Sequence, residues 1–196
     1  FDRTAEDVGN VVHLEHVNLR VPDQLLATRF YISALGLTRD PYLMTGVDNM
    51  WVNAGRTQFH LPHGGAQVLR GTIVVVVPDR EALLRRLQRA AAALQHTAYA
   101  FEPTADGIDV RCPWGNRLRC IEPASPQHGA TPLGIVRLEL DVPAGCAEGI
   151  ARFYREVLAA PATTLPTAAG LAQARVRVGA GQTLAFSETS AAAAAY

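Results

Sequence analysis

One pattern of residues occurs three times along the chain, and this repeat restricts the fold more than any other feature of the sequence. Three short segments carry hydrophobic residues at every second position and then reach a proline: EHVNLRVPD, GTIVVVVPD and VRLELDVPA. Alternation with a period of two is typical of a strand, and proline cannot continue a central strand. Each segment is therefore predicted to be a strand that ends at a turn.

A helix is predicted after each of these prolines, because DQLLATRFYISALG, DREALLRRLQRAAAAL and CAEGIARFYREVLAA have apolar residues at helical spacing. Asp23 and Asp79 are predicted N-caps of the first two helices, and Gly36 is predicted to end the first. Two pairs of adjacent aromatic residues on these helices are predicted to pack in the core: Phe30 with Tyr31, and Phe153 with Tyr154.

Further short strands follow each helix, so the repeated unit is βαβββ and the predicted fold class is α+β. Modules one and two are predicted at 11–62 and 71–123, and module three at 134–190. The segment 124–133 is rich in turn-forming residues and is predicted to be a linker. In module two, PWGN is predicted to be a hairpin turn, and ladder counting places Cys112 opposite Arg117.

Composition narrows the classes of function. The 18 basic residues, all arginine, balance 18 acidic residues, so the charge that non-specific binding to nucleic acid or to an anionic membrane needs is missing. Without lysine, mechanisms that use a lysine Schiff base or a lysine general base are excluded. There is no phosphate-binding loop or dinucleotide fingerprint, so no nucleotide cofactor is expected.

The expected location is the cytoplasm. The three cysteines are too few and too scattered for a disulfide framework, which favours a reducing compartment. The apolar runs have the length of strands, so neither a transmembrane helix nor a signal peptide is expected.

The repeat resembles the vicinal oxygen chelate superfamily, which includes glyoxalases, bleomycin-resistance proteins and extradiol dioxygenases. The resemblance rests on HVNLRVPD followed by FYISALGL, on the hairpin PWGNRLR, and on DVPAG with FYREVLA. It implies that two modules pair into an incomplete barrel around a cleft, where residues from the first and last strands of each module hold a divalent metal. The third module is then expected to pair with a missing fourth module, which we prefer, or with a second chain in a homodimer.

Strand alternation sorts the side chains of module one into two faces. Val17, Leu19 and Val21 are predicted to lie under the helix, and Thr57, Phe59 and Leu61 likewise share one face. The opposite face is predicted to carry His16 and Asn18 from the first strand, and Gln58 and His60 from the last. His16 and His60 match the metal-ligand positions of the superfamily, so the resemblance implies that they hold zinc, iron, manganese or nickel. The alternative is that they are polar residues in a wet cleft.

The matched positions of the other modules carry different residues. In module two they are Thr72 and Arg119, and an arginine cannot ligate a cation. Arg119 is instead predicted, with Asn18, Gln58 and Thr72, to line a pocket that clamps a carboxylate or similar anion. The alternative is that Arg119 extends to solvent at the rim of the barrel. If the strand register differs from the predicted one, Arg117 takes the place of Arg119 in the pocket. Module three has Arg137 at the histidine position, and Glu139 or Glu188 as acidic candidates.

Two main functions remain open at this point. The first is a metal-dependent enzyme, a lyase, isomerase or dioxygenase, that acts on a small oxygen-rich molecule and whose catalytic residues are not assigned. The second is a metal-free protein that binds and sequesters a small molecule, as bleomycin-resistance proteins do. A third possibility is a module array that serves only as an assembly scaffold.

Overall fold

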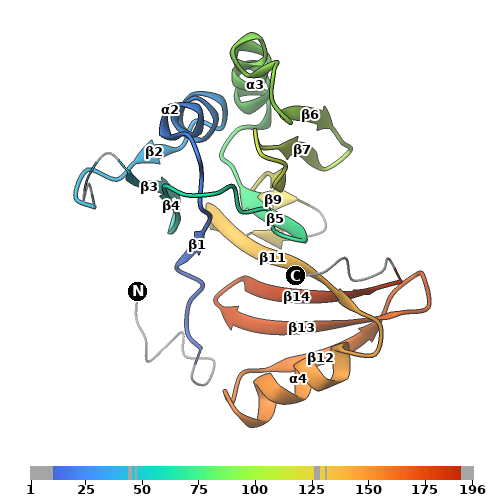
Figure 1. Cartoon of the computed structure of the whole chain (residues 1–196). Helices are drawn as coiled ribbons and strands as arrows, with labels where there is room; N and C mark the ends of the chain where they lie inside the picture. The colour runs from blue at the N-terminus through green and yellow to red at the C-terminus, as the bar shows by residue number, and fades with distance from the viewer. Residues whose placement is uncertain (1–10, 44–45, 47, 126–128, 131, 191–196) are drawn as a thin grey trace. The chain divides into compact units, whose positions relative to one another are not determined.

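The computed structural model describes residues 11–43, 46, 48–125, 129–130 and 132–190, and Figure 1 shows their course. They form two compact units, each described here by itself. One unit runs from Glu15 to Val136 and holds modules one and two, whereas the other joins the described residues up to Leu14 to those from Arg137 onward. The predicted α+β fold of repeated βαβββ modules is confirmed.

Module one forms a four-stranded sheet in the order β1-β4-β3-β2. Its elements are β1 (His16–Asn18), α2 (Gln24–Ala27), η1 (Thr28–Ala34), β2 (Thr38–Arg39), β3 (Asn49–Ala54) and β4 (Thr57–Pro62). The predicted helix is present, and its second part, η1, is π-helical. Asp23 caps it as predicted, because its carboxylate accepts a hydrogen bond from the Leu26 amide, and Gly36 follows the helix with a φ of +76°.

Module two contains β5 (Gly71–Val76), α3 (Arg80–Leu94), β6 (Ala100–Pro103), β7 (Gly107–Arg111) and β8 (Arg117–Ile121), with the strand order β5-β8-β7-β6. Asp79 caps α3 by accepting a hydrogen bond from Ala82, as predicted. The predicted register of the hairpin is wrong by one residue, because Cys112 closes the turn with a hydrogen bond to Asn116. Arg111, and not Cys112, therefore lies opposite Arg117.

The segment predicted as a linker contains two short strands, β9 (Ala124–Ser125) and β10 (Gly129–Ala130), which pair antiparallel. Residues 126–128 and 131 of this predicted linker lie outside the described residues.

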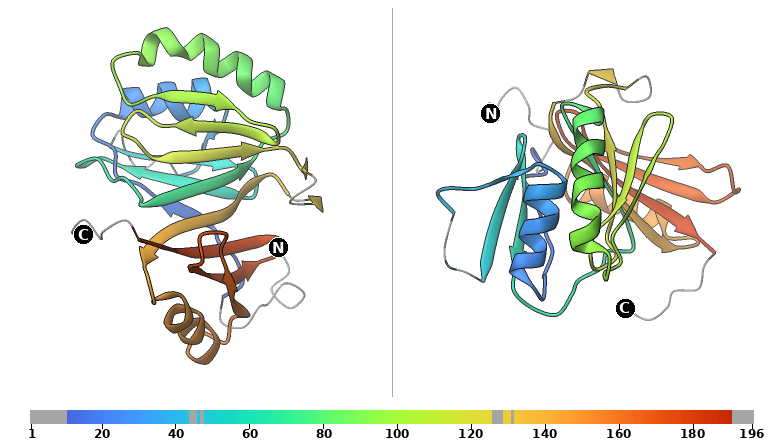
Figure 2. Two further views of the ribbon diagram at one scale, coloured as in Figure 1. Left: turned by 90° about the vertical axis from the view of Figure 1, so that its right-hand side faces the viewer. Right: turned by 90° about the horizontal axis from the view of Figure 1, so that it is seen from above.

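The helices of modules one and two pack against each other, and each also covers one face of its own sheet (Figure 2). Tyr31 of η1 contacts Phe59 of β4, with ring centroids 5.1 Å apart, and both side chains are fully buried. Across the helix pair, Arg86 of α3 donates a hydrogen bond to the Leu35 carbonyl, and a Cβ added at Gly36 would lie 2.4 Å from the Arg86 Nε. The helices thus form a layer between the two sheets, and the open faces of these sheets point away from each other.

Module three consists of β11 (Gly134–Pro143), α4 (Ala147–Glu156), β12 (Ala162–Pro166), β13 (Ala172–Gly179) and β14 (Gln182–Thr189). The first residues of β11, up to Val136, belong to the unit of modules one and two. In the third module's own unit, Tyr154 packs against the core as predicted, but Phe153 is 49% exposed, so that prediction is wrong. No helix in the described part of the chain has the length and apolarity needed to span a membrane.

Candidate functional site

The open face of the first sheet brings together the residues predicted for it in module one. In the parallel pairing of β1 with β4, His16 lies beside Gln58 and Asn18 lies beside His60. Neighbouring residues of paired strands share a face, so all four side chains project to the same side. The alternate residues Val17, Leu19, Val21, Thr57, Phe59 and Leu61 are buried, as predicted.

The two imidazoles of this face lie close together, and Trp51 of β3 lies against both. The ring centroids of His16 and His60 are 6.0 Å apart. Trp51, which is opposite His60 in the β3–β4 pairing, stacks on the His60 ring at 4.0 Å with an angle of 11° between the planes. Its ring also meets the His16 ring edge-on at 5.0 Å. The indole therefore restricts the orientation of both imidazoles.

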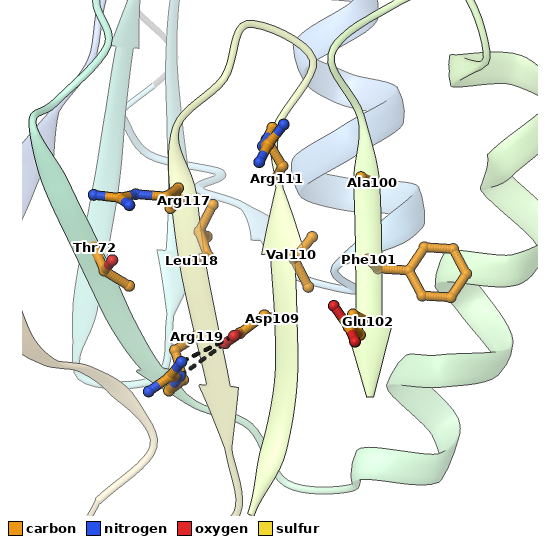
Figure 3. A pocket seen from close by; sticks show the side chains of 10 residues that line it. All are labelled: Thr72, Ala100, Phe101, Glu102, Asp109, Val110, Arg111, Arg117, Leu118 and Arg119. Atoms are coloured by element: carbon orange, nitrogen blue, oxygen red, sulfur yellow. Dashed lines mark hydrogen bonds and ion pairs between the residues drawn. The ribbon is translucent and has the colours of Figure 1, made fainter. Parts of the chain in front are cut away.

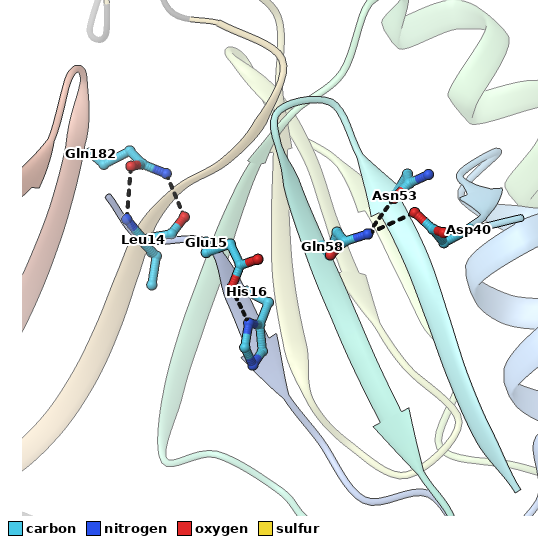
Figure 4. A network of polar contacts seen from close by, with 7 residues as sticks. All are labelled: Leu14, Glu15, His16, Asp40, Asn53, Gln58 and Gln182. Carbon is cyan, nitrogen blue, oxygen red and sulfur yellow. Dashed lines mark hydrogen bonds and ion pairs between the residues drawn. The ribbon is translucent and has the colours of Figure 1, made fainter. Parts of the chain in front are cut away.

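A hydrogen bond fixes the tautomer of each imidazole. The His16 Nδ1 donates to the Glu15 carboxylate over 2.8 Å, as Figure 4 shows. The His60 Nε2 donates to the Asn49 side-chain carbonyl. With those nitrogens protonated, the lone pair is on Nε2 of His16 and on Nδ1 of His60. Histidines that bind metals commonly donate their other ring nitrogen in this way, to a carboxylate or a carbonyl.

The electrostatics of the face favour neutral imidazole at His60. Partial burial, and after it the neighbouring His16 ring, lowers the pKa of His60 below its usual value of 6.5. His60 is therefore neutral at pH 7, and a neutral imidazole is the form that binds a metal ion.

Gln58 is held in a separate hydrogen-bond network on the same face (Figure 4). Its Nε2 donates to the Asp40 carboxylate over 2.9 Å and to the Asn53 carbonyl over 2.6 Å. The backbone amides of Leu43 and Tyr42 also donate to Asp40 and lower the pKa of its carboxyl group. Asp40 is thus a permanent acceptor that fixes the orientation of the Gln58 amide.

The structure does not bring the two predicted residues of module two to this face. Thr72 and Arg119 line a pocket on the open face of the second sheet (Figure 3). This sheet lies on the other side of the helix layer (Figure 2). Arg119 makes a bidentate ion pair with Asp109, with N–O distances of 2.7 and 2.9 Å, and both side chains are 43% exposed. The Arg119 fork therefore already holds a carboxylate of the protein itself.

The acidic candidates of module three also have partners. Glu139 pairs with Arg137 over 2.9 Å. Glu188 accepts hydrogen bonds from the amides of Ala147 and Ala172, which lower the pKa of its carboxyl group and tie β14 to the start of α4. Both carboxylates therefore have structural contacts within their own unit.

Two imidazoles fit part of a divalent-metal site. Imidazoles that share one ion have ring centres within roughly 6.5 Å of each other, because each N–metal bond is about 2.1 Å long. The observed 6.0 Å satisfies this limit. Over the residues that the structure describes, however, no three His, Cys, Asp or Glu side chains form a group that could hold a metal. The distance therefore allows His16 and His60 to share an ion, but the described residues contain no group of three ligands around them.

The sequence reasoning missed the residues that orient the imidazoles. Glu15 and Asn49 were not considered, although Glu15 adjoins His16 in the sequence and a carboxylate next to a strand histidine was a usable signal. Trp51 could have been found by pairing the two strands NMWVNA and TQFHLP across their short turn, which places it opposite His60.

Solved structures with the same fold include an oxygenase-type and a glyoxalase-type protein. A putative dioxygenase from Bacillus subtilis matches with a TM-score of 0.58 and 15% identity over 90% of this chain and 64% of its own. Two mutants of glyoxalase I from Zea mays match with TM-scores of 0.65 and 0.64 and identities of 14% and 15%, over 90% and 89% of this chain and 67% of theirs. The chain thus spans about two thirds of the length of these proteins.

At the level of sequence, no family model and no curated protein matches the chain. The structural matches cover 90% of the chain and agree with the repeat found in the sequence. The chain therefore shares the fold of these glyoxalase I mutants and of this putative dioxygenase, which agrees with the βαβββ repeat predicted from its sequence.

Proposed function

We propose that the open face of the first sheet is one half of a divalent-metal centre, in an enzyme that acts on a small molecule with neighbouring oxygen atoms. The observation that carries this proposal is the matched pair of imidazoles. His16 and His60 come from different strands, their rings are 6.0 Å apart, and each has its tautomer set by an acceptor on one nitrogen.

The side chains around the imidazoles have separate tasks in this proposal. Glu15 and Asn49 hold the rings so that one nitrogen of each can bind the ion. Trp51 covers the His60 ring and keeps water from one side of it. Asn18, on the same face, is placed to donate a hydrogen bond to an oxygen atom of a bound molecule. The Gln58 side-chain carbonyl is placed to accept one, because both N–H groups of this amide are already used within the protein. A divalent metal at this place supplies Lewis-acid chemistry, which polarises a bound oxygen and stabilises the negative charge that develops there.

The remaining ligands are proposed to come from another βαβββ module. The open face of module one points away from module two, so module two does not close over it. The additional module belongs either to a further part of the same protein or to a second copy in a homodimer. The proposed setting is the cytoplasm, which the three free cysteines of the structure support.

The experiment that tests this proposal is a measurement of bound metal. The protein is purified without chelator, its metal content is determined by mass spectrometry, and zinc, iron, manganese and nickel are titrated into the metal-free form. We expect a bound divalent metal in the wild type and its loss in the His16→Ala/His60→Ala double variant. His96→Ala removes an exposed histidine on a different element and is expected to retain the metal.

Two outcomes would contradict the metal centre. One is equal metal content in the wild type and the double variant, and the other is a wild type that binds none of the four metals. The second outcome favours the alternative function, a metal-free protein that binds a small molecule. That alternative is supported by a pocket of about 350 Å³ on the open face of the second sheet.

A further inference from the structure

The open face of the second sheet carries a charged pocket that the metal centre does not use. The pocket has a volume of about 350 Å³, within the range of sites for small molecules. Figure 3 shows its wall, to which β5, β8, β7 and β6 each contribute side chains. Its charged lining consists of three arginines and two acids: Arg111, Arg117, Arg119, Asp109 and Glu102.

One row of this face places two arginines next to each other. Arg111 of β7 lies directly opposite Arg117 of β8, and Thr72 of β5 lies on the other side of Arg117. Like charges directly opposite each other in a sheet are unfavourable. Figure 3 shows the Arg117 side chain extending toward Thr72 of β5, so an anion that contacts both arginines would lie across β8 and would turn this repulsion into attraction.

The two acids of the pocket lie outside this row. Asp109 is opposite Arg119 in the next row, and its two oxygens are held by the bidentate pair with that arginine. Glu102 lies beside Asp109 in the pairing of β6 with β7. Within the described part of the chain, Arg111 has neither an ion pair nor a hydrogen bond through its side chain. The carboxylates therefore lie one row away from Arg111.

The neighbouring arginine has a defined orientation. The Arg117 Nε donates to the Gly71 carbonyl over 3.0 Å, which fixes the plane of its guanidinium group. A guanidinium group presents N–H donors in a planar fork that matches the oxygens of a carboxylate or a phosphate. The Thr72 hydroxyl, in the same row, can donate a further hydrogen bond.

We propose that Arg111, Arg117 and Thr72 form a binding site for a small molecule with carboxylate or phosphate oxygens. This site lies on the opposite side of the helix layer from His16 and His60. It is therefore separate from the proposed metal centre and does not depend on it. Arg119, which was predicted to bind the anion, is not part of this site, because its guanidinium group pairs with Asp109.

The test is isothermal titration calorimetry of the full chain with two probes, inorganic phosphate and succinate, in buffer of low ionic strength. Loss of one charged fork from a site of this kind is expected to weaken binding at least about tenfold. Arg111→Gln and Arg117→Gln are therefore expected to weaken the binding of the preferred probe by at least that factor. The control Arg85→Gln removes an exposed arginine of α3 that pairs with Glu81, and it is expected to bind as the wild type does.

Arg111→Gln is the decisive variant, because Arg111 is exposed and its replacement is expected to leave the fold intact. Weaker binding of phosphate alone identifies a phosphate site, and weaker binding of succinate alone identifies a carboxylate site. Both results support the proposal, and added salt should weaken either interaction. The proposal is overturned if the wild type binds neither probe, or if Arg111→Gln binds as tightly as Arg85→Gln. The His16→Ala/His60→Ala variant should still bind the probe, which separates this site from the metal centre.

Discussion

Modules one and two use the same strand register to build open faces of different chemistry. His16 begins the row of the first sheet, with Gln58 beside it, and Thr72 begins the corresponding row of the second sheet, with Arg117 beside it. On the next strand of the first sheet, Asn53 lies opposite Gln58. At the matched place in the second sheet, Arg111 lies opposite Arg117. In the first row Gln58 is hydrogen-bonded to Asn53, whereas the second row carries two arginines.

The next row differs in the same manner. On the first sheet, Trp51 stacks on His60, and on the second sheet Asp109 occupies the place of the indole and pairs with Arg119. An imidazole with a free lone pair attracts a cation, and a guanidinium group repels one. In the two proposals made above, a few substitutions at matched positions change the preferred ligand of a face from a cation to an anion, while the backbone keeps its pattern.

The largest expected effect sharpens the first half of this comparison. Asn49→Ala removes the acceptor that sets the His60 tautomer, and the loss of such an orienting partner lowers metal affinity by about 10- to 100-fold. Zinc titration by calorimetry measures the change. Asn53→Ala, on the same strand and face, loses its contact with Gln58 and leaves the imidazoles untouched, so its metal affinity should stay at the wild-type level. Equal losses in both variants would contradict the assigned role of Asn49.

A smaller effect is expected in the second sheet. Asp109→Asn removes a negative charge beside the pocket, so the affinity for the anionic probe should rise by about three- to tenfold. The same change breaks the ion pair with Arg119, but both side chains are 43% exposed, so the free energy of unfolding should fall by less than about 1 kcal/mol. Calorimetry and urea denaturation measure the two effects. Unchanged or weaker anion binding would show that Asp109 does not oppose the ligand.

The smallest effect concerns the two opposed arginines. Arg111→Gln removes the like charge opposite Arg117, so the free energy of unfolding should rise by about 0.2 to 1 kcal/mol in the absence of an anion. Urea denaturation at low ionic strength measures this gain. Arg85→Gln loses an exposed pair with Glu81 and should instead be slightly destabilised. A destabilised Arg111→Gln would mean that Arg111 has a structural role and not a binding one.

The sequence was sufficient to predict which side chains share a face within a module. The alternation of buried and open residues around His16 and His60 was correct, and so were the helix caps at Asp23 and Asp79. These features are local, because they depend on strand pleat and on hydrogen bonds over three residues. Whether the two imidazoles bind a metal remains a prediction.

Two features could not be predicted from the sequence in the same way. Hairpin register depends on how the turn closes, and the bond from Cys112 to Asn116 places Arg111, and not Cys112, opposite Arg117. The relative orientation of modules one and two depends on packing between helices that are distant in the sequence, as at Leu35 and Arg86. The alternation of apolar and polar residues along a strand carries no information on this orientation. The grouping of Arg119 with the residues of module one failed for that reason.

The boundary between the two compact units has a practical consequence for dividing the protein. The Gln182 side chain donates to the Leu14 carbonyl and accepts from the Leu14 amide, so a short N-terminal segment is bound to module three (Figure 4). The backbone consequently passes from one unit to the other twice, after Leu14 and after Val136. A single protease cut at either crossing would leave the two units joined through the other crossing. A fragment that holds only modules one and two must be trimmed at both ends, and its N-terminal end then lies only one residue ahead of His16.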